Sequence, residues 1–319
     1  MTDVDYLTMM KSTIVRSQKS PWFLPLLRAA HGALSALAPA RAAKRAERLF
    51  TTPPRHRMPA AEVAALERAR PGWVRADGRA LRTWRWGHAP TVLLVHGWGG
   101  RGGQLAAFVT PLRAHGFGVV TFDAPGHGAS EGDSATIPQM VVAIRAVAAS
   151  HGPLAGLIAH SVGAAAAARA LYEGLELGAA VFVAAVAELV ESAERFIETL
   201  GFSPRVGELM RARIERRVGL PWSAFGVPEL APALKAPLLV AHDLGDAEIP
   251  WQHAQLIAQR WPGAELLLTD GLGHRRILSD PDVIAAAVSF LAARVAERSA
   301  GAITTCGDAS AACSEVAAR

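Results

Sequence analysis

Cysteine is almost absent from this sequence of 319 residues. The chain has two cysteines, Cys306 and Cys313, and both lie close to its C-terminal end. This excludes a fold held together by disulfides and argues against a metal site built on thiolates. Scarce cysteine is typical of proteins from a reducing compartment, so we expect a cytoplasmic protein.

The sequence also lacks a hydrophobic run long enough to cross a membrane. The longest candidate is the stretch 22–40, which Arg28, His31 and two prolines interrupt, whereas a spanning helix needs about 20 apolar residues. Basic residues before this stretch and Ala38-Pro39-Ala40 after it have the order of a signal peptide, but the apolar part is short and charged. An amphipathic surface helix is the better prediction.

Acidic residues are scarce in the first 90 positions, which hold 16 lysines and arginines against 6 acids, while the rest of the chain holds 17 against 22. Basic segments can contact nucleic acid or anionic lipid. A solvated helix face is the simpler explanation, because the spacing of three and four residues puts four of these side chains on one face. They are Arg41, Lys44, Arg45 and Arg48. We expect no nucleic-acid partner and leave open a weak contact with a membrane surface or a partner protein.

From residue 80 onward, strand and helix patterns alternate. The segment Ala80–Trp86 alternates like an edge strand or hairpin. Continuous apolar runs then predict buried strands at Thr91–Val95, Gly118–Phe122, Leu154–Ala159, Ala179–Ala184, Pro237–Asp243 and Glu265–Thr269. Helical segments separate them at Leu105–His115, Thr136–Ala149, Val162–Glu173 and Gln252–Arg260, and Asp282–Ala296 closes the series. This order predicts an α/β fold with a doubly wound, mostly parallel sheet.

Three segments lie outside that alternation. Residues 1–70 form a basic N-terminal extension with helices expected at Pro25–Leu37, Ala40–Leu49 and Ala60–Ala69. Residues 186–233 interrupt the α/β domain (71–298) with amphipathic helices at Glu188–Leu200 and Pro204–Val218, a natural cap or lid. Residues 299–319 are expected to be a flexible tail. No internal repeat occurs.

A single serine stands between a buried strand and a helix in the stretch 154–168, LAGLIAHSVGAAAAA. The apolar run through Ala159 is typical of a buried strand, and the alanines after Gly163 favour a helix. A strained turn at such a corner holds a serine hydroxyl out above the end of a sheet. Ser161 is therefore the candidate nucleophile.

Other polar residues also follow predicted strands. Asp243 and Asp246 stand at and beyond the end of one strand, and His274 comes five residues past Thr269. The carboxyl ends of parallel strands meet at one edge of a sheet, so we expect His274 and an aspartate to meet Ser161 there. A serine needs a histidine to take its proton, and the histidine needs a carboxylate to orient it.

Two aspartates could supply that carboxylate. Asp246 is favoured because it lies on the loop beyond the strand, in the spacing Asp-x-x-Ile249-Pro250. Asp243, at the strand end, is expected to make local hydrogen bonds. Whether Asp243 can replace Asp246 stays open at this point.

Acyl transfer also requires donors aimed at the oxyanion of the transition state, and the loss of one such donor costs about 3–4 kcal/mol. The main-chain amide of Val162, directly after the serine and at a helix start, is one candidate. The second is the amide of Trp98, in the glycine-rich loop after the TVLLV strand. His96, Gly97 and Gly99 would support this loop, since glycines let a backbone approach the substrate closely.

Five motifs occur in one order along the chain. They are His96-Gly97-Trp98-Gly99-Gly100, Asp123-Ala124-Pro125-Gly126-His127-Gly128-Ala129-Ser130, His160-Ser161-Val162-Gly163, Asp246-x-x-Ile249-Pro250 and Gly271-Leu272-Gly273-His274. With these motifs the sequence resembles the α/β-hydrolase fold family over roughly residues 75–295, in the family's order of Ser, Asp and His. The resemblance implies a helical cap, which the insertion 186–233 would form. One departure is Ala159, where the family usually has glycine.

The glycine-rich loop also fits a different class of protein. Gly97-x-Gly99-x-x-Gly102 follows a strand and precedes a helix, and Asp123 ends the next strand, as in NAD(P)-binding oxidoreductases. That alternative leaves Ser161 and His274 without a role. A further alternative keeps the hydrolase fold as a catalytically silent binding or scaffold protein, although all three triad positions are filled.

The favoured prediction is a serine hydrolase that cleaves a carboxylic ester of a small-molecule acyl substrate through an acyl-serine intermediate. A serine in place of an aspartate at the corner disfavours haloalkane and epoxide opening, whereas thioesters, lactones, amides and some C–C bonds stay open. This chemistry requires no metal and no organic cofactor. The sequence predicts neither the acyl chain, nor the oligomeric state, nor the role of residues 1–70.

Overall fold

The chain folds around one mostly parallel sheet. The computed structural model describes residues 24–316, so the basic residues ahead of the 22–40 stretch and the last three residues of the expected tail lie outside the described part. The strands of that part are β1 (Arg70–Ala76), β2 (Arg79–Trp86), β3 (Thr91–Val95), β4 (Gly118–Phe122), β5 (Leu154–His160), β6 (Leu177–Val183), β7 (Leu238–Asp243) and β8 (Glu265–Thr269). They form one sheet in the order β1-β2-β4-β3-β5-β6-β7-β8. The β1–β2 and β2–β4 pairs are antiparallel and the others are parallel, which confirms the α/β fold class.

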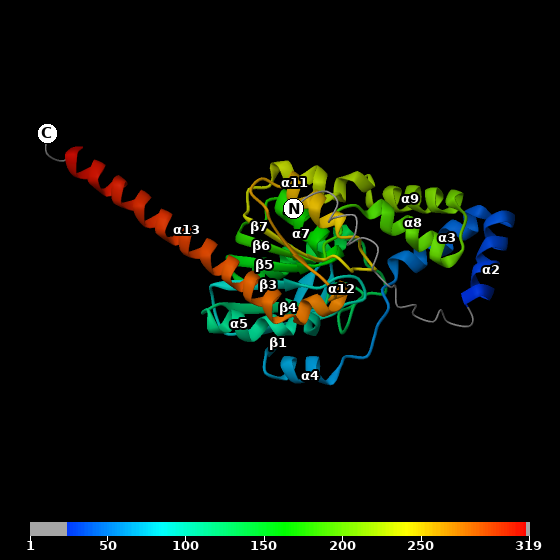
Figure 1. Ribbon diagram of the computed structural model, residues 1–319, viewed down its shortest axis with the longest axis horizontal. Coiled ribbons are helices and arrows are strands. Elements are labelled where there is room, and N and C mark those ends of the chain that lie inside the picture. Colours follow the sequence, from blue (N-terminus) through cyan, green and yellow to red (C-terminus); the bar gives the residue numbers. More distant parts are fainter. Residues whose placement is uncertain (1–23, 317–319) are drawn as a thin grey trace, which may run out of the picture.

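Helices cover both faces of this sheet (Figure 1). One layer holds α6 (Ile137–His151), α7 (Val162–Tyr172) and α11 (Gln252–Arg260), and the other holds α5 (Val109–Ala114) and α13 (Pro281–Val316). In β3, Leu93 and Val95 pack into the first layer, whereas Val92 and Leu94 pack into the second, because successive side chains of a strand point to opposite faces. The apolar runs of the sequence are therefore strands that are buried on both sides.

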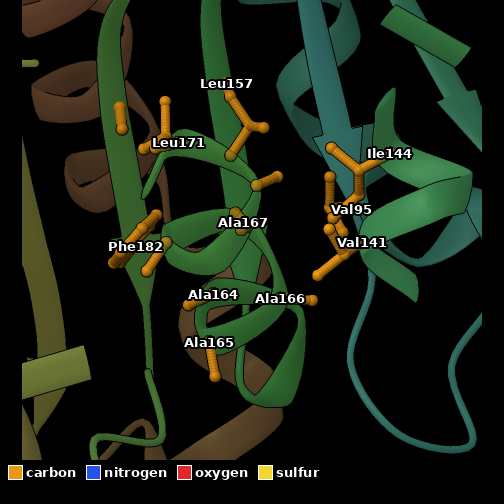
Figure 2. Packing of buried hydrophobic residues seen from close by; sticks show 14 of the residues in the cluster. Val95, Val141, Ile144, Leu157, Ala164, Ala165, Ala166, Ala167, Leu171 and Phe182 are labelled. Carbon is orange, nitrogen blue, oxygen red and sulfur yellow. The ribbon is translucent and has the colours of Figure 1, made fainter. Parts of the chain in front are cut away.

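Helix α7, which begins directly after Ser161, is almost entirely buried. Its alanines from Ala164 to Ala168 have no exposed surface. They pack in one cluster with Phe182 of β6 and with Val141 and Ile144 of α6, which flank the helix in Figure 2. Because alanine carries a single methyl group, the helix can approach the sheet and α6 closely. The core therefore fixes the start of α7, and with it the position of Ser161.

The N-terminal extension and the insertion at residues 186–233 pack against each other. The extension contributes α2 (Leu24–Leu37), α3 (Pro39–Thr51) and α4 (Ala60–Glu67); the insertion contributes α8 (Leu189–Leu200), α9 (Pro204–Val218) and α10 (Val227–Leu230). Helices α2, α3, α8 and α9 lie together at one end of the molecule (Figure 1). Ala42 and Ala46 of α3 are buried in one cluster with Val206 and Met210 of α9. We call this unit the four-helix cluster.

The charges of α3 are divided between its two sides. Its basic residues Arg41, Lys44, Arg45 and Arg48 are exposed. Its acid, Glu47, is buried and lies 2.6 Å from the Arg213 guanidinium and 3.2 Å from that of Arg217, both on α9. The Glu47 carboxylate is therefore paired with arginines of α9, and the basic side chains of α3 face solvent.

The last helix is longer than the sequence predicts. Helix α13 continues past Ala296 to Val316 and includes residues 299–316, for which a flexible tail is expected. Its distal end projects away from the sheet (Figure 1). The segment is rich in alanine, the residue with the highest helix propensity, and has no proline to end it. No helix of the described residues, α13 included, is both long and apolar enough to cross a membrane.

Candidate active site

Ser161 occupies a strained corner between β5 and α7, which we call the elbow. Its φ is 55° and its ψ is −126°, a positive φ that costs an ordinary residue about 1–3 kcal/mol. The backbone holds it there, since the Ser161 amide donates to the Val183 carbonyl at 3.0 Å and the Ser161 carbonyl accepts from the Ala164 amide at 3.0 Å. Ala159 lies in register between Val95 and Phe182, fully buried. The methyl group at this position, where the family usually has glycine, is therefore part of the core.

The structure brings Ser161, His274 and Asp246 into one hydrogen-bonded chain. His274 Nε2 lies 3.2 Å from the Ser161 hydroxyl oxygen, 113 residues away in sequence, and His274 Nδ1 lies 2.7 Å from Asp246 Oδ2. With Nδ1–H donating to the carboxylate, the neutral imidazole has Nε2 free to accept the serine proton. All three residues are less than 10% exposed. This is the arrangement in which a serine can be activated as a nucleophile.

Asp246 is held as an anion by several donors. Its Oδ1 accepts the amides of Glu248 at 2.8 Å and Ile249 at 2.9 Å. Burial alone would raise the pKa of this carboxyl, but hydrogen bonds from His242, His274 and the Ile249 amide outweigh burial and hold the pKa well below its usual range. The carboxylate is therefore charged at neutral pH and can stabilise a positive imidazolium on His274.

Asp243 makes no hydrogen bond to the His274 ring and joins two loops instead. Its carboxylate accepts from the Gly245 amide at 3.0 Å, the Thr269 hydroxyl at 2.8 Å and the Leu272 amide at 2.9 Å. Burial would raise its pKa, yet the backbone amides of Gly273 and Leu272 lead a set of donors that lowers it. Asp243 thus fixes the loop that carries His274, while Asp246 reaches the imidazole.

The glycine-rich loop after β3 lies directly against the elbow. A Cβ atom at Gly97 would stand 2.8 Å from Ser161 Cβ and 3.0 Å from His160 Nδ1, so only glycine fits. His96 ties this loop to the one after β4, because its Nε2 accepts the Ala124 amide at 2.9 Å and its Nδ1 lies 2.7 Å from the Gly97 carbonyl. Burial lowers the pKa of His96 to about 4, so the ring is neutral at physiological pH.

The two predicted oxyanion donors are the residues that directly follow Gly97 and Ser161. Trp98 directly follows Gly97, and Val162 is the first residue of α7. Among the hydrogen bonds of the described residues, neither main-chain amide has a protein acceptor. Trp98 is 38% exposed, and its ring packs edge-on against that of His127, with ring centroids 5.4 Å apart. Both amides therefore remain available to a substrate oxygen.

The dinucleotide alternative fails at Asp123. An acid at this place in a nucleotide-binding fold has to reach a ribose hydroxyl, but Asp123 is fully buried. Its Oδ1 accepts the Gly102 amide and its Oδ2 accepts the Ala129 amide, each at 2.7 Å. Burial raises its pKa, against the lowering effect of these amides. Asp123 therefore holds the glycine-rich loop in place and is not accessible to a cofactor.

Two histidines contribute to the site in a way that the sequence does not reveal. His160 Nε2 donates to the His274 carbonyl at 3.0 Å, with ring centroids 4.7 Å apart, and burial lowers the pKa of His160 to about 3. His242 Nε2 lies 3.3 Å from Asp246 Oδ2 and 3.0 Å from the Ile249 carbonyl. His160 next to the serine is interpretable from sequence only as a structural residue; its contact with His274 depends on the fold. In the described part of the chain, no cluster of three metal-ligating side chains occurs.

Comparison with known proteins identifies the class to which this site belongs. Residues 92–287, more than half of the chain, match the model of the alpha/beta hydrolase family. The chain therefore belongs to the alpha/beta hydrolase family. Residues 24–69 of the N-terminal extension lie outside the matched range.

The relatives of this chain include esterases. It is 27% identical over 250 residues to the pimeloyl-[acyl-carrier protein] methyl ester esterase of Xanthomonas campestris pv. campestris, a match that covers 65% of this chain and 97% of the relative. A putative lipase of Acinetobacter baumannii superposes with a TM-score of 0.59 at 16% identity, covering 76% of this chain and 99% of the other. An esterase of Pyrococcus furiosus superposes with a TM-score of 0.58 at 20% identity, covering 76% and 96%. The solved structures share the fold, and the family and its esterase members support carboxylic ester hydrolase activity.

Proposed function

We propose that this protein hydrolyses a carboxylic ester through an acyl intermediate on Ser161. The observation that carries the proposal is the hydrogen-bonded chain from the Ser161 hydroxyl through His274 to Asp246, built on a strained corner at the end of a parallel sheet. Nucleophile and base within hydrogen-bond reach, with the base oriented by a third group, are the signature of covalent acyl transfer.

In the first half of the reaction, Ser161 Oγ attacks the ester carbonyl carbon while His274 Nε2 takes the hydroxyl proton. The carbonyl oxygen becomes an oxyanion, which the amides of Trp98 and Val162 stabilise; the dipole of α7 adds to this effect at Val162. When the tetrahedral intermediate collapses, the C–O bond to the leaving alcohol breaks and His274 gives that alcohol its proton. Ser161 is left as an acyl ester.

In the second half, water repeats these steps in the place of the serine. His274 takes a proton from the water as its oxygen attacks the acyl carbonyl, and the same two amides receive the oxyanion. The bond to Ser161 Oγ then breaks, the serine regains its proton from His274, and the carboxylic acid leaves. Asp246 stabilises the imidazolium in both halves because its lowered pKa keeps it charged.

The proposed substrate is a small-molecule ester that binds beneath a helical cap. We assign the insertion at residues 186–233 to a cap above Ser161, with the four-helix cluster as its outer part. The Xanthomonas relative acts, by its name, on a methyl ester, which favours an ester over a thioester, lactone or amide as the first substrate to test. We place the reaction in the cytoplasm, in line with the scarcity of cysteine.

The test compares Ser161→Ala with the wild type on p-nitrophenyl esters of increasing acyl length, and with a fluorophosphonate probe that labels activated serines. We expect Ser161→Ala to lose activity by several orders of magnitude and to lose the label. The matched control is Ser150→Ala, because Ser150 lies exposed on α6 and bonds only to the Ala146 carbonyl. A folded wild-type protein that neither hydrolyses esters nor takes the label would favour the catalytically silent alternative.

A further inference from the structure

The segment between α3 and the end of α4 runs along the outer side of the glycine-rich loop that carries Trp98. At Gly99, a Cβ atom would stand 3.0 Å from Pro54 Cγ, so Pro54 lies in contact with the loop one residue after Trp98. At Gly103, a Cβ atom would stand 2.9 Å from Glu62 Cβ. The segment belongs to the N-terminal extension, which lies outside the family match at residues 92–287.

The strongest contact between this segment and the loop is the ion pair of Glu62 with Arg101. Arg101 Nε lies 2.5 Å from Glu62 Oε2 and Arg101 Nη2 lies 2.7 Å from Glu62 Oε1, so the ion pair is bidentate. The side chains are 14% and 18% exposed, so water screens the pair little. Such planar pairs fix orientation as well as distance. Arg101 is three residues from Trp98 in sequence.

A second set of contacts reaches the loop that supports the glycine-rich loop from below. Arg55 donates through its guanidinium to three main-chain carbonyls of residues 126–132, those of Gly126, Ser130 and Gly132, at 3.2, 3.1 and 2.7 Å. The Thr51 carbonyl accepts the Ala135 amide at 2.8 Å. This neighbouring loop follows Asp123, which accepts the Gly102 amide, and Ala124, whose amide donates to His96. The extension therefore contacts both the glycine-rich loop and the loop that supports it.

The glycine-rich loop is short and tightly turned, so a constraint on one end reaches the other. The Gly100 amide donates to the Gly97 carbonyl at 3.1 Å, which closes a turn around Trp98. On its inner side the loop touches Ser161 through Gly97. Its outer side is held by Pro54 and by Glu62 through Arg101. Trp98 thus lies between two fixed points, one of which the N-terminal extension supplies.

We propose that Glu62 is a positioning residue for the glycine-rich loop. Through Arg101, Glu62 holds the Trp98 amide where it can donate to the oxyanion that forms at Ser161. This rests on the proposed function, in which the Trp98 amide receives the oxyanion. An oxyanion donor has to stand about 2.7–3.1 Å from an oxygen that is charged only in the transition state. Loosening the loop therefore lowers kcat and leaves KM nearly unchanged, because the ground-state ester gains little from this donor.

The main experiment measures the kinetics of Glu62→Gln in the full-length chain on the best p-nitrophenyl ester. Gln keeps the shape of Glu62 and removes the charge. We expect kcat to fall about tenfold, equivalent to about 1.4 kcal/mol of transition-state stabilisation, with KM within about twofold. The inhibition constant of a trifluoromethyl ketone, which forms an oxyanion-bearing adduct with the serine, should rise by the same factor. Arg101→Gln should behave alike, and the double variant should lose no more than either single one.

The matched control is Glu173→Gln. This change also breaks an ion pair of a glutamate with an arginine, since Glu173 Oε1 lies 2.7 Å from Arg169 Nε, but at the far end of α7. We expect kcat and the inhibition constant to stay at wild-type values there. An unchanged kcat in Glu62→Gln, or a rise in KM alone, would overturn the positioning role.

A further measurement separates this proposal from the proposed function. Hydrogen–deuterium exchange of peptides covering residues 97–103 requires no activity, and we expect faster exchange in Glu62→Gln than in the wild type and in Glu173→Gln. Exchange that is unchanged overturns the proposal even if the enzyme is an esterase. If the wild type shows no ester hydrolysis and no fluorophosphonate label, the proposed function fails, and the exchange still decides whether Glu62 holds the loop. If Glu62→Gln does not fold, the variant to use is Arg101→Lys. It keeps the positive charge and cannot form the bidentate pair.

Discussion

Asp246 and His274 are joined by a 2.7 Å hydrogen bond between Oδ2 and Nδ1. Asp243, three residues earlier, reaches the same histidine loop at a different place, the Leu272 amide. The two carboxylates at the end of β7 therefore have different roles. Asp243 sets the position of the loop, and Asp246 sets the orientation and charge of the ring that the loop carries.

This division predicts different losses from the same chemical change. Asp246→Asn should lower kcat about 10⁴-fold, because an amide in place of the carboxylate favours the wrong imidazole tautomer. Asp243→Asn should cost activity far less and lower the free energy of unfolding by about 1–3 kcal/mol, since the NH2 group that replaces one carboxylate oxygen then faces either the Gly245 or the Leu272 amide, donor against donor. Steady-state kinetics and urea unfolding of both variants measure this. A larger kcat loss at Asp243 would show that the roles are reversed.

Much of the fold is predictable from the sequence because its signals are local. The runs Thr91–Val95 and Gly118–Phe122 are strands with the bounds that the apolar pattern predicts, and Leu154–Ala159 ends one residue early. Strands buried on both faces leave continuous apolar letters, and parallel strands bring their ends to one edge. Those two facts are enough to predict that Ser161, His274 and one of the two aspartates after β7 meet; the choice of Asp246 depends on its place in the spacing Asp-x-x-Ile249-Pro250.

Most of what the sequence does not reveal is non-local. The alanines of α3 indicate a buried face but not that α9, more than 150 residues later, covers it. The contact of Glu62 with Arg101 and that of His160 with the His274 carbonyl likewise join residues of different elements. One missed feature is local, the continuation of α13 past Ala296. It follows from helix propensity alone, because this segment has no apolar stripe from which periodicity could predict a helix.

Gly97 is predicted to be irreplaceable even by alanine. The added methyl group would meet Ser161 Cβ at 2.8 Å and His160 Nδ1 at 3.0 Å, so the glycine-rich loop has to move away from the elbow. We expect kcat for p-nitrophenyl esters to fall about 100-fold, as for the loss of an oxyanion donor. The control is Gly32→Ala on α2, where the nearest atom to the new methyl is 3.8 Å away and activity should be unchanged. Equal activity of the two variants would contradict this account of the loop.

The alanines of α7 predict a steric effect on the elbow. Ala167→Leu adds three carbons in a fully buried position between the sheet and α6. We expect the free energy of unfolding to fall by about 1–3 kcal/mol, as is usual for overpacking, and the activity to fall with it because α7 begins at Ser161. Ala29→Leu on the exposed side of α2 is the matched control. Urea unfolding together with ester turnover tests both effects; an Ala167→Leu variant as stable as the control would show that α7 can shift.

Buried neutral histidines predict how stability depends on pH. Burial lowers the pKa of His96 to about 4 and those of His127 and His160 to about 3, against about 6.5 in an unfolded chain. Between these values the unfolded state binds more protons than the folded state, so the free energy of unfolding falls as pH falls from 6.5 toward 3. Each histidine contributes a slope of up to about 1.4 kcal/mol per pH unit.

Replacing one of these rings should remove its share of that slope. We expect His160→Gln, whose amide can still donate to the His274 carbonyl, to flatten the fall of the free energy of unfolding between pH 6.5 and 4. Urea titrations at half-unit steps of pH give the slope for the variant and the wild type. His115→Gln, at an exposed position, is the control and should retain the wild-type slope. A slope that is as steep in His160→Gln as in the wild type would mean that His160 binds its proton over the same pH range in the folded and the unfolded protein, and its pKa would then not be lowered by burial.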